Sequence, residues 1–282
     1  MKLAILARTD KRVQMELGET DPMIANALRR TLIADVPKMA IEDVEFHLGP
    51  IRSEDGKEYE SIAPLFDEIL AHRLGLVPLP TDLDLFVPKA TCKTCGGEGC
   101  TNCTIIYSIN KRGPGMVSSG DLEPIGDPKL RPPDAKIPLV QLGDGQAMLV
   151  YATAVLGTGR DHAKWQPTTA IAYKYRPAVD IDNKKMDPKK FPVEVCPVDI
   201  LHHEDGKVVV RDEEKCTLCN ACVEYAKKQG WEGAFKVRGD PARILLGFET
   251  DGSIPAVRAL EEALGILERR FADLAGQMEE LT

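Results

Sequence analysis

Cys216-Thr-Leu-Cys219-Asn-Ala-Cys222 is the stretch of this chain that most narrows the choice of fold. Three cysteines spaced in this way can bind three irons of one iron–sulfur cluster, and the fourth ligand of a bacterial-type cluster is a cysteine followed by proline. Cys196-Pro197 supplies that fourth cysteine. The four thiolates predict a [4Fe-4S] cluster, or a [3Fe-4S] cluster where one iron is lost. A zinc site and two disulfides are the alternatives for these cysteines.

The residues that link these cysteines predict a β-hairpin. Asp205-Gly206 is a turn dipeptide, and apolar residues flank it within residues 199–210. Such a hairpin would return Cys196 to the loop that holds the other ligands. The arrangement resembles one half of a two-cluster ferredoxin, and one cluster is expected because the ligand positions of the second are occupied by other residues. These are Met186, Lys189, Pro192 and Ala226-Lys227.

A second cysteine group lies earlier in the chain. Residues 92–103 read Cys-Lys-Thr-Cys-Gly-Gly-Glu-Gly-Cys-Thr-Asn-Cys, so two Cys-x-x-Cys pairs flank a glycine-rich tetrad. Four thiolates complete the coordination of zinc without an open position, which is typical of a structural ion. We therefore expect zinc at Cys92, Cys95, Cys100 and Cys103, with an additional iron–sulfur cluster or free thiols as alternatives. The pattern also resembles one unit of the zinc-binding region of Hsp40-type chaperones, which contains several such units.

Composition limits the location and the partners of the chain. The 282 residues carry a formal net charge of −8, and an acidic chain binds nucleic acid poorly by itself because phosphate contacts need clustered Lys and Arg. Eight cysteines that all fall in metal-site patterns are typical of a reducing compartment. The start of the chain is apolar for only five residues, too short for a signal peptide, and we find no stretch long enough to span a membrane. We expect a cytoplasmic protein.

Residues 254–282 predict a long amphipathic helix. Its large apolar residues alternate spacings of three and four, which is a heptad pattern. Ser253 is the expected start, with Pro255 in the first turn. We define the apolar stripe as Val257, Leu260, Leu264, Leu267, Phe271, Leu274, Met278 and Leu281. The stripe either packs on the core of its own chain or, as we expect, meets a helix of a second chain.

The opposite end of the chain predicts two short strands and a helix. The strands lie within residues 3–17, on either side of Thr9-Asp10-Lys11. Asp21 as an N-cap and Pro22 as the first helical residue predict a helix that ends at about Ala34. The helix carries Asn26, Arg29 and Arg30. Its two arginines either face solvent or contact a partner.

Four further segments carry a resemblance. They are Asn26-Ala-Leu-Arg-Arg-Thr-Leu32, Ala40-Ile-Glu-Asp-Val44, and the longer segments 65–79 and 157–167. In this order they resemble the family that contains the α subunit of bacterial RNA polymerase, the D subunits of archaeal polymerases and the eukaryotic third-largest polymerase subunit. The predicted terminal helix lies where this family has its dimerisation helix, and a ferredoxin-like insert is a feature of many archaeal D subunits. The chain is identified as an archaeal member of this family.

The resemblance implies an α+β fold with three domains. A discontinuous dimerisation domain, similar to that of the α subunit, would comprise residues 1–45 and 226–282. Residues 46–167 would form an inserted mixed or β domain that holds the zinc site. Residues 168–225 would form the ferredoxin-like iron–sulfur domain.

The resemblance also implies a non-catalytic assembly platform of archaeal DNA-dependent RNA polymerase. Such a chain would heterodimerise with subunit L, recruit subunits N and P, and join the second-largest and largest subunits. Nucleic acid would be bound only through the assembled polymerase. No catalytic residues are expected, and His72 and His162 would pack or contact other subunits. The expected partner-binding residues are Asn26, Arg29, Arg30, Val257, Leu260, Leu264, Leu267, Phe271 and Leu274.

A ferredoxin-like electron-transfer protein, or a subunit of an oxidoreductase, is the alternative function. It accounts for residues 196–222 but leaves the apolar stripe and the cysteine pairs at 92–103 without a purpose. A single cluster without a neighbour in its own module also argues against a dedicated electron carrier. A chaperone related to Hsp40 would account only for residues 92–103.

Overall fold

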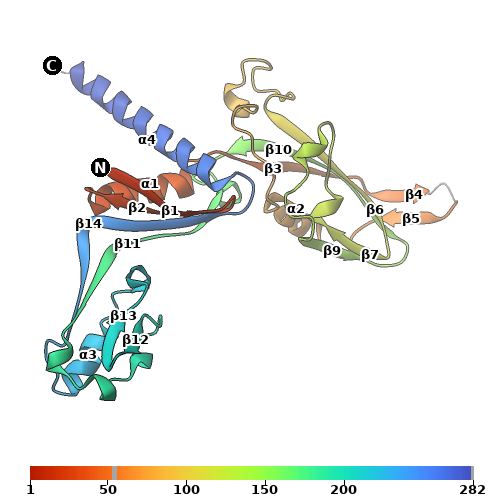
Figure 1. Cartoon of the computed structure of the whole chain (residues 1–282). Coiled ribbons are helices and arrows are strands. Elements are labelled where there is room, and N and C mark those ends of the chain that lie inside the picture. The colour runs from red at the N-terminus through yellow and green to blue at the C-terminus, as the bar shows by residue number, and fades with distance from the viewer. Residues whose placement is uncertain (53–55, 281–282) are drawn as a thin grey trace. The chain divides into compact units, whose positions relative to one another are not determined.

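The computed structural model describes residues 1–52 and 56–280, so Leu281 of the apolar stripe lies outside the described residues. Helices and strands are mixed along the chain (Figure 1), which agrees with the expected mixture of α and β structure. The chain forms two compact units. The first comprises Met1–Ala7, Gln14–Ala27 and Ala172–Gly247, and the second comprises Arg8–Val13, Leu28–Ile171 and Phe248–Thr282. The division into three domains stays a prediction.

A four-stranded sheet lies mainly in the first unit and has the strand order β1-β2-β14-β11. In β2, Val13, Met15 and Leu17 are buried, whereas Gln14 and Glu16 between them are half-buried. This alternation arises because every second side chain of a strand points to the same face. The two strands predicted around Thr9-Asp10-Lys11 are confirmed as β1 and β2. The bounds of the strands are β1 Lys2–Arg8, β2 Arg12–Gly18, β11 Thr168–Ile181 and β14 Phe235–Thr250.

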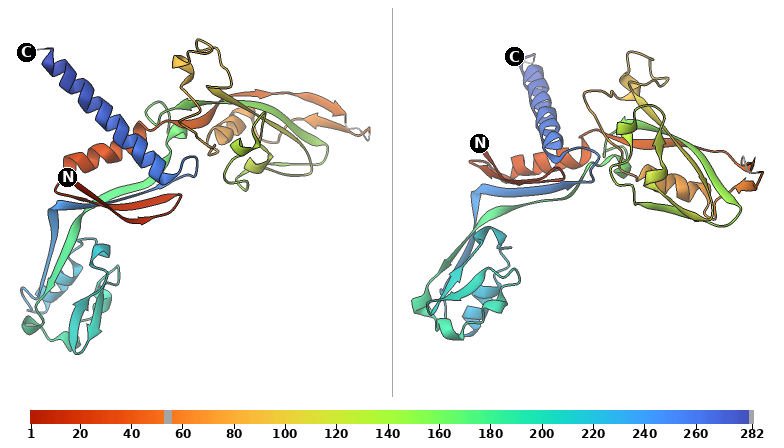
Figure 2. Two further views of the ribbon diagram at one scale, coloured as in Figure 1. Left: turned by 45° about the horizontal axis from the view of Figure 1, so that its top comes forward. Right: turned by 45° about the vertical axis from the view of Figure 1, so that its right-hand side comes forward.

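The predicted β-hairpin is present in the first unit. Strand β12 (Leu201–Glu204) pairs antiparallel with β13 (Lys207–Val210). Asp205 and Gly206 have φ angles of 49° and 72°, and positive φ at both central residues is what a type I′ turn requires. Figures 1 and 2 show the hairpin beside helix α3 (Ala221–Lys228), and residues of all three elements share one apolar core.

Apolar side chains occupy two positions at which a second cluster would have its ligands. Met186 and Ala226 are both buried in the core that the hairpin shares with α3. Phe191 is buried there as well, and its ring centroid lies 4.7 Å from that of Phe235. Hydrophobic packing therefore stabilises this part of the first unit, residues 179–237, which we call the small subdomain.

A second sheet, with six strands, organises the second unit. Its central strand β10 pairs antiparallel with both β3 and β6, and the start of β10 runs parallel to β5. The strand order is β4-β5-β10-β6-β8, with β3 also paired to β10, while β7 and β9 form a separate two-stranded sheet. The bounds are β3 Lys38–Phe46, β4 Gly49–Arg52, β5 Glu58–Ser61, β6 Thr104–Arg112, β7 Gly115–Ser118, β8 Glu123–Pro124, β9 Pro138–Leu142 and β10 Gln146–Gly157.

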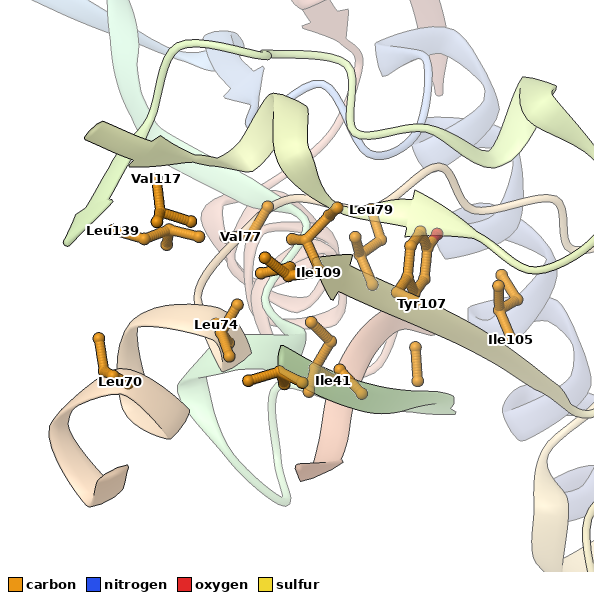
Figure 3. Close-up of a cluster of buried hydrophobic side chains, with 14 of the residues drawn as sticks. Ile41, Leu70, Leu74, Val77, Leu79, Ile105, Tyr107, Ile109, Val117 and Leu139 are labelled. Atoms are coloured by element: carbon orange, nitrogen blue, oxygen red, sulfur yellow. The ribbon is translucent and has the colours of Figure 1, made fainter. Parts of the chain in front are cut away.

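Helix α2 (Asp67–Gly75) covers this sheet and closes the main core of the unit. Figure 3 shows Leu74 of α2 directed toward Ile109 of β6, and both side chains are fully buried. Tyr107 of β6 is buried beside them and donates its hydroxyl to the carbonyl oxygen of Leu130 at 2.7 Å. Burial raises the pKa of Tyr107, so the phenol stays protonated and keeps this hydrogen bond.

The two predicted terminal helices are present. Helix α1 (Pro22–Ala34) begins as expected, because Oδ1 of Asp21 accepts the amide of Met23 at 2.7 Å. Helix α4 (Ala256–Glu279) begins one residue after Pro255, which is its N-cap and not a residue of its first turn as predicted. Ser253 does not start the helix, because its amide and hydroxyl both donate to Asp251. In the part of the chain that the structure describes, every helix is too short or too polar to cross a membrane.

The segment 157–167 packs a tryptophan against bare backbone. The ring of Trp165 is so close to Gly157 that an added Cβ would lie 2.4 Å from two ring carbons. The indole nitrogen of Trp165 donates to the carbonyl oxygen of Val155 at 3.1 Å, and the ammonium of Lys164 lies 4.3 Å from the ring centroid. Glycine at position 157 is therefore a packing requirement of the second unit.

We predict that Gly157→Ala lowers the free energy of unfolding by about 1–3 kcal/mol, because the new methyl group overpacks the Trp165 site. The matched control is Gly276→Ala in α4, where a Cβ would meet nothing within 4 Å. There the same substitution removes the backbone entropy of glycine and should stabilise by about 0.5–1 kcal/mol. Urea denaturation followed by tryptophan fluorescence measures both changes. Equal effects of the two substitutions would contradict the assignment.

Candidate metal centres and helical interface

The four cysteines of residues 92–103 converge in the second unit. They follow the 3₁₀ turn Lys89–Thr91 and precede β6, and their sulfur atoms all lie within 4.8 Å of one another. The Sγ–Sγ distances are 3.7 Å between Cys92 and Cys100 and 3.6 Å between Cys95 and Cys103. A disulfide would bring two sulfurs to about 2.05 Å, so these thiols are not paired with each other. The group can hold a metal ion.

The spacing of these sulfurs is that of one tetrahedral ion. Four thiolates at about 2.3 Å from a common centre lie about 3.8 Å apart along the edges of the tetrahedron. Backbone amides also point at the sulfurs: Gly99 donates to Sγ of Cys95, and Cys100 donates to Sγ of Cys103, both at 3.3 Å. Gly96, Gly97 and Gly99 all have positive φ, a conformation that glycine adopts without steric cost, so these residues allow the short turn between the two cysteine pairs.

Electrostatics differ among the four thiols. Hydrogen bonds, first from the amide of Gly99, lower the pKa of Cys95 to about 6, whereas burial raises the pKa of Cys103 to about 12. The four groups therefore do not share one protonation state near neutral pH. A bound cation favours the thiolate at every position, so metal binding at this site releases protons.

The second cysteine set lies in the small subdomain of the first unit. Cys196, Cys216 and Cys222 all contact its apolar core, whereas Cys219 is exposed. Within residues 1–52 and 56–280, the single-ion spacing is found at 92–103 and not in this set. A cubane cluster does not require that spacing, because it places a separate iron under each thiolate.

The loop around these cysteines has an irregular backbone. Leu218 and Asn220, which lie on either side of Cys219, both have positive φ, and Cys222 lies in the first turn of α3. Burial raises the pKa of Cys222 to about 11. Lys174 of β11 donates to the carbonyl oxygen of Cys216 at 2.8 Å. The sequence patterns did not indicate Lys174, because it lies 42 residues from its partner.

The apolar stripe of α4 is covered along only part of its length. Leu260 is buried, and Val257 and Leu267 are half-buried. The other members of the stripe within the described residues are exposed. Their exposed fractions are 37% for Leu264, 56% for Phe271, 55% for Leu274 and 60% for Met278. The helix thus packs on its own chain near its start and leaves the rest of the stripe in water.

An ion-pair cluster fixes α4 near the end of α1. Asp35, which directly follows α1, is only 7% exposed and pairs with Arg270 of α4 and with Arg160, both at 2.6 Å. Burial raises the pKa of Asp35, but the hydrogen bonds from Arg270 and Arg160 outweigh it, so the pKa lies below its ordinary value. Asp35 could not be predicted from the sequence, because its partners lie 125 and 235 residues away and no local pattern marks it.

The predicted partner-binding residues of α1 lie along one helix. Asn26 and Arg29 are half-buried and Arg30 is exposed. His72 on α2 is exposed, and so is His162, whose Nδ1 accepts the amide of Lys164 at 3.0 Å.

Comparison with known proteins identifies the family. Residues 14–271 match the RNA polymerase Rpb3/Rpb11 dimerisation domain. DNA-directed RNA polymerase subunit Rpo3 of Thermoplasma volcanium is 42% identical over 280 residues, which cover 99% of this chain and 100% of the relative. The chain belongs to the Rpo3 family. The Rpo3 proteins of Picrophilus torridus (41% over 278 residues; 99% and 100%) and Methanosarcina acetivorans (32% over 283; 100% and 99%) are similar along the same length.

Rpo3 and the archaeal D subunit are the same protein, so the resemblance noted from the sequence is confirmed. The similarity to Rpo3 proteins extends over both units and does not stop at the cysteine-rich subdomain. The alternative of a ferredoxin-like electron carrier is therefore not supported.

We predict that Asp35→Asn loosens α4. At neutral pH the loss of the charged acceptor should cost about 2 kcal/mol of stability and raise hydrogen exchange in residues 264–280. Because the pKa of Asp35 is lowered in the folded state, its contribution is complete above the ordinary value of 3.8 and is lost as the pH falls through the folded value. The difference in unfolding free energy between wild type and variant should thus be constant at neutral pH and shrink below about pH 4. A difference that persists into stronger acid would contradict this role.

Proposed function

We propose that this chain is the non-catalytic assembly platform of an archaeal DNA-dependent RNA polymerase. The observation that carries the proposal is the match to Rpo3 proteins along the full chain, combined with an apolar stripe on α4 that is exposed at Leu264, Phe271, Leu274 and Met278. The match to the Rpb3/Rpb11 dimerisation domain supports pairing with a second α-like chain.

Subunit L is the proposed partner of the uncovered part of the stripe. Fully burying one large apolar side chain contributes roughly 1.5–3 kcal/mol. Covering the exposed parts of Leu264, Phe271, Leu274 and Met278, which together equal about two whole side chains, would therefore contribute on the order of 3–6 kcal/mol before the cost of association. The ion pairs of Asp35 support this assignment, because a helix held in place by its own chain loses less entropy when a partner docks on it.

The other proposed partners follow from family membership. The heterodimer would recruit subunits N and P and then the second-largest and largest subunits, with nucleic acid bound only through the complete polymerase. Asn26, Arg29 and Arg30 are proposed to contribute to these subunit contacts. We also retain the three-domain division at residues 1–45 with 226–282, 46–167 and 168–225. None of the eight cysteines, all within the described residues, forms a disulfide, which supports a reducing cytoplasm as the location.

Zinc is the proposed ion at Cys92, Cys95, Cys100 and Cys103. The four-thiolate donor set and sulfur spacings of 3.6–3.8 Å fit zinc, and they leave no position open for a substrate. A structural zinc ion contributes ~10–16 kcal/mol of apparent binding energy, which orders a loop that has little apolar content of its own. The residues hold the ion and take no part in chemistry.

A [4Fe-4S] cluster is the proposed group at Cys196, Cys216, Cys219 and Cys222. Four thiolates are the donor set that a [4Fe-4S] cluster requires. Cys196, Cys216 and Cys222 contact one apolar core, and Cys219 lies in the same loop between two residues of positive φ. When bound, the cluster would supply covalent cross-links between the loop and the hairpin. The apolar residues Met186 and Ala226 at the second-cluster positions support a structural role over electron relay.

The stripe can be tested with a charge substitution and a control at a nearby position outside it. We expect Leu274→Glu to abolish or weaken by at least about tenfold the complex with co-expressed subunit L, because a carboxylate would be buried without a partner. Ala272→Glu adds the same charge at an exposed position outside the stripe and should leave the complex unchanged. Affinity can be measured by calorimetry on the purified subunits. Equal binding of subunit L by both variants would show that the apolar stripe is not the binding surface.

The metals can be tested by elemental analysis of protein purified without air. We expect about one zinc ion and about four irons with matching sulfide per chain. Cys95→Ser should remove zinc and leave iron, whereas Cys219→Ser should remove iron wholly or in part and leave zinc. Cys219 suits the test because its exposed side chain can be changed without a packing defect. Zinc in place of iron at Cys196, Cys216, Cys219 and Cys222 would contradict the proposed cluster.

A further inference from the structure

Two hydrogen bonds join the loop that carries Cys216 to strand β11 in the first unit. Lys174 of β11 donates from Nζ to the carbonyl oxygen of Cys216 at 2.8 Å. Further along the strand, the amide of Val179 donates to Oε1 of Glu213 at 2.7 Å. Glu213 begins the 3₁₀ turn that ends just before Cys216, so the segment 213–216 is tied to β11 at both of its ends.

The hydrogen bond of Lys174 does not by itself offset the cost of removing its ammonium group from water. The side chain is half-buried and its hydrogen-bond acceptor is a neutral carbonyl oxygen, while the nearby carboxylate of Glu214 offsets part of its charge. Removing an ammonium from water is unfavourable unless an anion compensates it, and a carbonyl dipole compensates only in part. An iron–sulfur core bound by four thiolates has a net negative charge. Such a group at Cys216 would place an anion beside this ammonium.

We propose that Lys174 is a positioning residue for the iron–sulfur site: it fixes the ligand loop to β11 and supplies the positive charge that offsets the bound cluster. The inference rests on the proposed cluster at Cys196, Cys216, Cys219 and Cys222. It goes beyond that proposal because it makes the order of β11 depend on occupancy of the site. The same hydrogen bond belongs to the strand and to the ligand loop, so loosening of one loosens the other.

The charge has a second consequence. Reduction adds an electron to the cluster, and a nearby cation stabilises the more negative, reduced form. Lys174 therefore shifts the reduction potential of the site upward. Removing its charge should shift the potential to a more negative value, which loss of a purely structural contact would not do.

Three variants of the full-length chain separate these effects. Lys174→Met removes the donor and the charge but keeps the length of the side chain, and Lys174→Arg restores both. The matched control is Lys215→Met, because Lys215 directly precedes Cys216 but is exposed and pairs with Asp212. Each protein is reconstituted with iron and sulfide without air. The measurements are the rate of iron release to a chelator, the reduction potential and hydrogen exchange of residues 172–181.

We expect Lys174→Met to release iron roughly tenfold faster than wild type, as the loss of a charge-assisted hydrogen bond predicts. Its potential should be more negative and residues 172–181 should exchange faster, while Lys174→Arg and Lys215→Met behave like wild type. If Lys174→Met matches Lys215→Met in all three measurements, the inference is wrong and the cluster assignment stands. If wild-type protein binds no iron and sulfide, the cluster assignment fails and this inference fails with it.

Discussion

The hydrophobic effect acting on one helix is the constraint on which the rest of this structure depends. Helix α4 buries its first turns against its own chain and then leaves Phe271, Leu274 and Met278 in water. A stable monomer gains nothing from that arrangement, because the exposed side chains add unfavourable hydration and favour aggregation. The arrangement is favourable only if another surface covers the stripe, which is why family membership and helix geometry point to the same function. The buried carboxylate of Asp35 holds this helix through its ion pair with Arg270.

The cysteine-containing segment 92–103 has few apolar residues with which to form a hydrophobic core. The segment 92–103 is largely glycine and polar residues, and such a segment cannot bury enough apolar surface to offset its conformational entropy. The four converging sulfurs form a site that can hold a metal ion, and a bound ion stabilises such a segment in place of a hydrophobic core. The small subdomain of the first unit contains both a hydrophobic core and a proposed metal site. Phe191 and Phe235 pack in its core, and three cysteines of the proposed cluster contact the same core.

Local patterns could be predicted from the sequence, and distant pairings could not. The Asp205-Gly206 hairpin, the Asp21 cap and the two Cys-x-x-Cys pairs each depend on residues a few positions apart, and the structure has all of them. The start of α4 was placed wrongly because Ser253 is a good cap by residue type, yet its hydroxyl is engaged by Asp251. The partners of Asp35 and Lys174 come together only when the chain is folded, so no spacing rule indicates them. The two-unit division likewise depends on segments that meet from distant parts of the sequence.

The pattern of retained and lost cysteines supports a structural use of the proposed cluster. An electron relay needs a second redox centre within reach, and the matching positions in this subdomain hold Met186 and Ala226 inside an apolar core. Those buried side chains contribute apolar packing at positions where a second cluster would have its ligands. The half that retains cysteines is tied to β11 through Lys174 and Glu213. Binding of a cluster at these cysteines would therefore restrain β11, which is a strand of the four-stranded sheet. Through this connection a metal site could influence the assembly of a polymerase without taking part in catalysis.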